Sequence, residues 1–153
     1  MVERLKNNDI ETAINIREVF QLSYAIEAKI LNAINFPPLQ RPLEDYINST
    51  NVFFGFFKNQ ELAGAIEIHH NDIATYIDSL VVNPKYFKQG IASKLLEFVF
   101  NTSDSEQFFV ETGLKNKPAI QLYLKFGFKE IKQWDTDHGA VSYTHLTLPT
   151  RCH

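Results

Sequence analysis

The stretch Tyr76–Phe100, YIDSLVVNPKYFKQGIASKLLEFVF, decides the fold of this chain. An apolar strand runs into a basic turn that contains Gly90, and the turn opens directly into an amphipathic helix. The first N–H groups of a helix have no intrahelical partner, and they carry the positive end of the helix dipole. With Lys85 and Lys88 beside a glycine that lets a ligand approach the backbone, the stretch predicts a site for an anion such as a phosphate.

Upstream of this stretch, the pattern predicts helices followed by strands. Val2–Leu5 is strand-like, and Asp9 is suited to cap a helix that continues to about Asn35. Three prolines then prevent a helix, and strand-like runs alternate with turns. The predicted elements here are a loop at Phe36–Pro42, a short helix at Leu43–Asn48, and strands at Val52–Phe57, Leu62–His69 and Ile73–Val82.

Downstream, the chain alternates between helix and strand. The predicted elements are a helix at Gly90–Asn101, a strand at Gln107–Thr112, a helix capped by Asn116, and a strand at Phe128–Trp134. Helices, then antiparallel strands, then strand–helix–strand–helix–strand predict a mixed α/β (α+β) fold around one core. A length of 153 residues suits a single domain, which we assign to residues 1–140.

Composition excludes several classes of protein. A formal charge of −3 argues against a general nucleic-acid binder, and no apolar run is long enough for a membrane helix. The polar N-terminus does not resemble a signal peptide, and a single cysteine, Cys152, excludes an internal disulfide framework. We therefore expect a cytoplasmic protein without nucleic-acid or membrane partners. No metal-ligand spacing is visible, and the oligomeric state is left open, a homodimer included.

The last residues differ in amino-acid composition from the rest of the chain. Val141–His153, VSYTHLTLPTRCH, is rich in threonine, and VSYTHL is what one reading frame of a common transposase-based sequencing adapter encodes. We expect this segment to be a non-native tail that should be kept out of functional reasoning. The alternative is a native threonine-rich strand, and sequencing the source gene across the junction decides between them.

The turn and helix of the deciding stretch resemble the acyl-CoA-binding motif of the GCN5-related N-acetyltransferase (GNAT) family. That motif reads Gln/Arg-x-x-Gly-x-Gly/Ala before a helix, and Gly90 and Ala92 match its last two fixed positions. The first fixed position is Phe87 here, where the family has Gln or Arg, and the neighbouring Lys88 can supply the charge.

A second, independent match lies at Asn116–Phe128, NKPAIQLYLKFGF. It resembles the later family motif N-x-x-A-x-x-L-Y-x-x-x-G-F in register. Together with the preceding strand, the resemblance covers about residues 73–134, and a further strand lies between the two motifs. The resemblance implies a single GNAT-like domain whose central mixed, mostly antiparallel sheet has helices on both faces.

The resemblance also implies a function and assigns residues to it. An acetyl group would move from acetyl-CoA, as co-substrate, to a primary amine by direct attack in a ternary complex, which makes the chain an N-acetyltransferase (EC 2.3.1.-). Tyr123 would lie near the thioester sulfur and act as general acid. The residues expected to bind the coenzyme are Leu80, Val81, Val82, Lys88, Gln89, Gly90, Ile91, Ala92, Ser93, Asn116 and Tyr123.

The general base is not fixed by the motifs. Glu67 and Asp78 lie in strands that face the expected acceptor region, and each is either a catalytic carboxylate or an outward charge. A chain of water molecules is an equal alternative. The loop at 35–46 is expected to border the acceptor site, and Glu111 and Thr112 to shape it.

Two other functions stay open. The acceptor could be a protein N-terminus or lysine rather than a small amine. The chain could also be a non-catalytic acyl-CoA-binding or regulatory module, an alternative motivated by Phe87 and the unidentified base.

Overall fold

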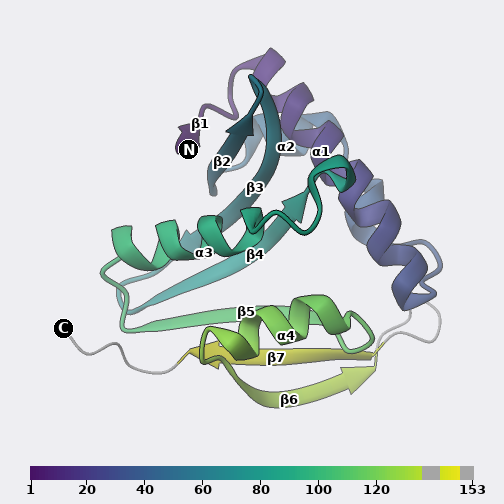
Figure 1. Cartoon of the computed structure of the whole chain (residues 1–153), viewed down its shortest axis with the longest axis vertical. Helices are drawn as coiled ribbons and strands as arrows, with labels where there is room; N and C mark the ends of the chain where they lie inside the picture. Colours follow the sequence, from purple (N-terminus) through teal and green to yellow (C-terminus); the bar gives the residue numbers. More distant parts are fainter. Residues whose placement is uncertain (136–141, 149–153) are drawn as a thin grey trace.

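The computed structural model describes residues 1–135 and 142–148. Figure 1 shows a sheet with helices packed on it. The strands are β1 (Val2–Leu5), β2 (Val52–Lys58), β3 (Glu61–His70), β4 (Ala74–Val82), β5 (Gln107–Gly113), β6 (Lys129–Asp135) and β7 (Ser142–Leu148). The α-helices are α1 (Ile10–Leu31), α2 (Leu43–Asn48), α3 (Ile91–Thr102) and α4 (Lys117–Lys125), and short 3₁₀ helices are η1 (Pro37–Gln40) and η2 (Pro84–Tyr86).

The strands form one seven-stranded sheet in the order β1-β2-β3-β4-β5-β7-β6. All neighbours are antiparallel except β4 and β5, which are parallel and are joined by α3. A parallel pair needs a crossover connection, and α3 is that crossover. The predicted mixed, mostly antiparallel sheet is confirmed.

Helices cover both faces of the sheet, as predicted. On one face, α1 and α2 bury residues such as Phe20 and Tyr46 against Phe53 and Val81 of the strands. On the other face, α3 packs through its apolar stripe, Ile91, Leu95, Leu96 and Val99, and the buried Tyr123 of α4 joins the same core. The alternation of β-strand side chains divides the sheet residues between these two cores.

The ends of α1 follow from local chemistry. Asp9 caps the helix by accepting from the Thr12 N–H at 3.1 Å, as the sequence indicated. At the other end Asn32 adopts the left-handed conformation, with φ of 56°, and stops the helix. The predicted end at about Asn35 was therefore too late, because asparagine tolerates positive φ and takes the cap position early.

The sheet is split between β4 and β5. These strands pair only through residues 74–77 and 107–110, and beyond that point they separate toward α1 (Figure 1). A β-bulge adds to the local distortion, because Glu67 pairs with Ser79 and Ile68 pairs with Ile77, which leaves Asp78 as the extra residue.

β7 falls within the segment that we expect to be a non-native tail. It lies between β5 and β6, and Thr144 and Leu146 are buried. Ser142–Leu148 therefore occupies a central place in this half of the sheet, whatever its origin. The division at residue 140 stays a prediction, and residues 136–141 and 149–153 lie outside the described residues.

Across residues 1–135 and 142–148, no helix is both long and apolar enough to cross a bilayer.

Candidate active site

A cleft of about 770 Å³ runs through the split between β4 and β5. It is lined from one side by α1 and the residues after it, and from the other by the first turns of α3 and α4. The predicted site residues that line it are Asp78, Leu80, Val82, Lys88, Gln89, Gly90, Ile91, Ala92, Ser93, Asn116 and Tyr123. Glu67 and Val81 do not line it, because both are buried on the α1 face of the sheet.

The first turn of α3 offers backbone donors to the cleft. Gly90 is the N-cap residue, with φ of 75° and no side-chain cap. The N–H groups of Ile91, Ala92 and Ser93 have no intrahelical acceptor at this position of a helix. A Cβ built on Gly90 would meet nothing within 4 Å, so the space in front of the helix end is open to a ligand. The arrangement suits a phosphate or pyrophosphate.

The irregular position of the first motif also faces the cleft. Phe87 is 42 % exposed and lines the cleft together with Lys88, which has a φ of 63°. A phenylalanine cannot donate a hydrogen bond to a phosphate. At this end of the cleft Lys88 therefore supplies the positive charge, and the backbone N–H groups of α3 supply the hydrogen-bond donors for a phosphate.

The second motif contributes the N-terminus of α4. The Asn116 side chain caps the helix by accepting from the Ala119 N–H at 3.4 Å, and its Nδ2 donates to Oε1 of Glu27 at 2.9 Å. Tyr123 is buried on the same helix, and burial is the main reason that its pKa is raised, with a smaller contribution from Glu27. Its hydroxyl is therefore protonated at neutral pH and can donate.

Glu67 is fixed by four hydrogen bonds. Its two carboxylate oxygens accept from Arg41 at 2.8 and 3.0 Å, and they also accept from Asn51 at 2.9 Å and Ser79 at 3.1 Å. The Arg41 guanidinium in turn lies 4.1 Å from the centre of the Tyr46 ring. This network ties the segment after η1 to β3.

Asp78 is paired with a histidine. Its Oδ2 lies 2.6 Å from His69 Nδ1 and accepts from Asn51 Nδ2 at 3.1 Å. Partial burial raises the pKa of Asp78, and His69 opposes that shift. His69 stacks on Tyr76, which stacks on Phe109, with ring centres 4.8 and 5.1 Å apart. These three rings line the end of the cleft that also contains Glu111 and Thr112.

Sequence reasoning missed Glu27 of α1. This carboxyl group lines the cleft, and burial raises its pKa from 4.5 to about 7 against the opposing hydrogen bond from Asn116. A signal was present in the sequence. Phe20, Tyr24, Glu27 and Leu31 follow the i, i+4, i+7, i+11 spacing of one helix face. A carboxylate in an apolar stripe of this kind is a candidate functional group.

Among the residues that the structure describes, no cluster of three or more His, Cys, Asp or Glu side chains is arranged to hold a metal ion.

Residues 16–128 match the sequence model of the Acetyltransferase (GNAT) family. Streptothricin acetyltransferase from Escherichia coli is 32% identical over 148 residues, which cover 92% of this chain and 80% of that protein. The UPF0157 protein YqkA from Bacillus subtilis is 34% identical over 152 residues, or 99% of this chain. The chain spans 44% of the length of YqkA.

Solved structures of low sequence identity share the fold. The ribosomal-protein-S18-alanine N-acetyltransferase from Escherichia coli superimposes with a TM-score of 0.79 at 17% identity, covering 100% of this chain and 95% of that one. The PaiA N-acetyltransferase from Thermoplasma acidophilum, solved in complex with coenzyme A, gives 0.71 at 20% identity and covers 99% of each chain.

Proposed function

Because this chain belongs to the Acetyltransferase (GNAT) family, we propose that it transfers the acetyl group of acetyl-CoA to a primary amine by direct attack in a ternary complex. The membership confirms the family resemblance of the two motifs. The observation that carries the proposal is the cleft itself, because residues of both motifs, at the first turns of α3 and α4, line it.

The residues of the cleft suit a thioester of a phosphorylated coenzyme. Backbone donors of Gly90–Ser93 and the charge of Lys88 suit the pyrophosphate. At Leu80 and Val82 the edge of β4 does not pair with β5. Its backbone groups there can form hydrogen bonds with an extended pantetheine arm. Acetyl-CoA is thus the co-substrate that these residues would hold.

Tyr123 is proposed as the general acid. When the tetrahedral intermediate collapses, the C–S bond breaks and the leaving thiolate needs a proton. A buried tyrosine whose pKa is raised keeps that proton at neutral pH until the thiolate is formed. No covalent intermediate on the enzyme is required.

A small amine is the favoured acceptor. The relative named streptothricin acetyltransferase matches over nearly the whole of this chain, whereas an N-alpha-acetyltransferase from Saccharolobus solfataricus matches over 52% of it. The acceptor end of the cleft, with Asp78 and Glu111, is suited to a cationic amine.

The test is release of free thiol from acetyl-CoA over three sets of acceptors: small primary amines, peptides with a free N-terminus, and peptides with an internal lysine. We expect turnover with a member of the first set. Turnover confined to peptides would replace the small acceptor with a protein. Tight binding of acetyl-CoA in calorimetry without turnover of any amine would favour the non-catalytic binding module.

A further inference from the structure

We propose that Glu27 of α1 is the general base that takes the proton from the acceptor amine, in place of the strand carboxylates Glu67 and Asp78. This inference rests on the proposed function, since it assigns a residue to that same reaction.

The position of Glu27 follows from how α1 crosses the split. Leu31, one turn further along the helix, packs so closely against the end of β5 that a Cβ on Gly113 would clash with its side chain. Tyr24, one turn before, lines the cleft. α1 therefore spans from the β4 half of the molecule to the β5 half, and Glu27 faces the space between them.

The orientation of Glu27 is set by the second motif. Asn116 is buried, its Oδ1 is used by the Ala119 N–H, and its Nδ2 therefore points at Oε1 of Glu27. Among the described residues, Oε2 of Glu27 has no hydrogen-bond partner. One oxygen is thus held in place, and the other is available to accept a proton.

The charges around Glu27 also distinguish it from its rivals. Glu67 is bound on both oxygens by Arg41, and Asp78 is paired with His69. The Arg41 guanidinium makes the Glu67 carboxylate a weak base. Oδ2 of Asp78 already accepts from Asn51 and lies 2.6 Å from His69 Nδ1. Within residues 1–135 and 142–148, no Lys, Arg or His forms an ion pair with Glu27.

Titratable groups reach the cleft around Glu27 from each element. Those groups are Tyr24 on α1 itself, Tyr123 on α4, His69 on β3, Tyr76 and Asp78 on β4, Glu111 on β5, and Tyr86 and Lys88 before α3. The carboxylates of Asp78 and Glu111 favour a cationic acceptor. Burial brings the pKa of Glu27 to about 7, where the ionised form is well populated at neutral pH and accepts a proton more readily than an ordinary carboxylate.

The proton balance is complete with these two residues and solvent. The Glu27 carboxylate takes one proton from the acceptor ammonium and passes it to solvent. The amine lone pair then forms the C–N bond to the thioester carbon. As the C–S bond breaks, the thiolate takes the Tyr123 proton, and the second proton of the former ammonium restores the Tyr123 hydroxyl through water. The products are the amide, the free thiol and one proton in solution.

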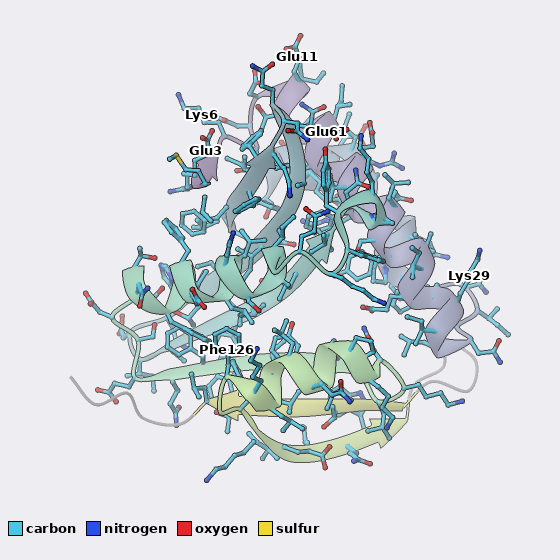
Figure 2. All side chains as sticks on the ribbon, viewed as in Figure 1. Glu3, Lys6, Glu11, Lys29, Glu61 and Phe126 are labelled. Carbon is cyan, nitrogen blue, oxygen red and sulfur yellow. The ribbon has the colours of Figure 1, made fainter. Side chains whose placement is uncertain are left out.

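The experiment compares Glu27→Gln with Glu11→Gln across the pH range. Glutamine has the shape of glutamate and can still accept from Asn116, but it cannot take a proton. Glu11 is the matched control because it is exposed and lies on the same helix, far from Glu27. Figure 2 shows Glu11 at the opposite end of α1 from Lys29, which is close to Glu27 in the sequence. We expect Glu27→Gln to lower kcat at neutral pH by about 10²-fold or more, with the KM for acetyl-CoA within about twofold of wild type.

The pH profile identifies the group that acts. The acid limb of kcat, with its midpoint near 7, should disappear in Glu27→Gln and persist in Glu11→Gln. It should also persist in Asp78→Asn, whatever that substitution does to the rate. A wild-type profile in Glu27→Gln, or loss of the limb in Asp78→Asn alone, would overturn the assignment.

A second measurement does not depend on activity. An infrared difference titration of wild type against Glu27→Gln isolates the protonated carboxyl band of Glu27. A midpoint near 7 supports a carboxyl poised as a base, and a midpoint close to the ordinary value of 4.5 overturns it. If no amine is turned over by the wild type, the proposed function fails, whereas the titration still decides the state of Glu27.

Discussion

Arg41 and Glu67 form a two-point ion pair, with Nη1–Oε1 at 2.8 Å and Nη2–Oε2 at 3.0 Å. The pair joins the proline-rich segment to β3, and only 2 % of the Glu67 side chain is exposed. The proline-rich segment that borders the cleft is thus anchored to the sheet through the buried Glu67 carboxylate, which would destabilise the fold without its cationic partner.

Arg41→Met should leave Glu67 buried without its partner. We expect the free energy of unfolding, measured in urea, to fall by about 3–5 kcal/mol. Lys85→Met is the control, because the Lys85–Glu61 pair has a similar N–O distance of 2.8 Å but both side chains are largely exposed. A loss of stability as large in the control as in Arg41→Met would contradict this account.

Tyr123→Phe should separate acid catalysis from packing. The ring stays in the core, but the hydroxyl that would protonate the leaving thiolate is removed. We expect kcat to fall about 10²-fold or more while the KM for acetyl-CoA changes little. Tyr46→Phe serves as the comparison, since its buried hydroxyl has no hydrogen-bond partner among the described residues and Tyr46 does not line the cleft. An unchanged rate in Tyr123→Phe removes the assigned role.

Gly90→Glu should prevent binding of the coenzyme. The new side chain would enter the open space before α3 and would bring a negative charge to the site where the phosphates are expected. Gly90→Asn separates the two effects, because asparagine tolerates the φ of 75° and carries no charge. Calorimetry with acetyl-CoA should show no binding for the first variant and weakened binding for the second. Retained affinity in Gly90→Glu would place the phosphates elsewhere.

Glu27 should make stability depend on pH. Its pKa is about 7 in the folded protein against 4.5 ordinarily, so the folded state binds the proton more tightly than the unfolded chain. The stability linked to that proton is complete below about pH 4.5 and is lost as the pH rises through about 7. Glu27→Gln cannot ionise, so it should exceed wild type by on the order of 1–3 kcal/mol at about pH 8 and by much less at about pH 5. If the stability difference between Glu27→Gln and wild type does not change with pH, folding does not shift the pKa of Glu27.

Leu146→Ala tests whether β7 belongs to the core. Leu146 is 1% exposed and packs in the core that contains Tyr123 and Phe128. We expect a loss of about 2–5 kcal/mol in urea unfolding. Ile131→Ala on the neighbouring β6 is the control, because Ile131 is 55% exposed. If Leu146→Ala is as stable as wild type, residues 142–148 do not contribute to the core.

The framework of the fold was predictable because its signals are local. Hydrophobic periodicity, the caps Asp9 and Asn116, and the turn before Gly90 each act within a few residues, and the structure places elements close to every predicted position. The site was predictable only where a motif carried it. The part of the cleft proposed to bind the coenzyme is lined by residues of the two motifs, whereas the part proposed for the acceptor depends on contacts between distant segments.

Three features needed the tertiary structure. Arg41 meets Glu67 across 26 residues of sequence, and Glu27 meets Asn116 across 89, so neither pair leaves a pattern in the sequence. The bulge at Asp78 is a one-residue shift in pairing with β3, which alternation along one strand cannot reveal.

The sheet order gives the last described strand an unusual part in folding during synthesis. β7 leaves the ribosome after β5 and β6 but lies between them, so these two strands cannot complete their pairing until it arrives. Until then each presents an unpaired edge that can associate with other chains. Helix α3 can dock earlier, because the strands that it contacts, β1 to β4, all precede it in the chain. A nascent chain stalled before residue 142 would therefore be a natural target for chaperones.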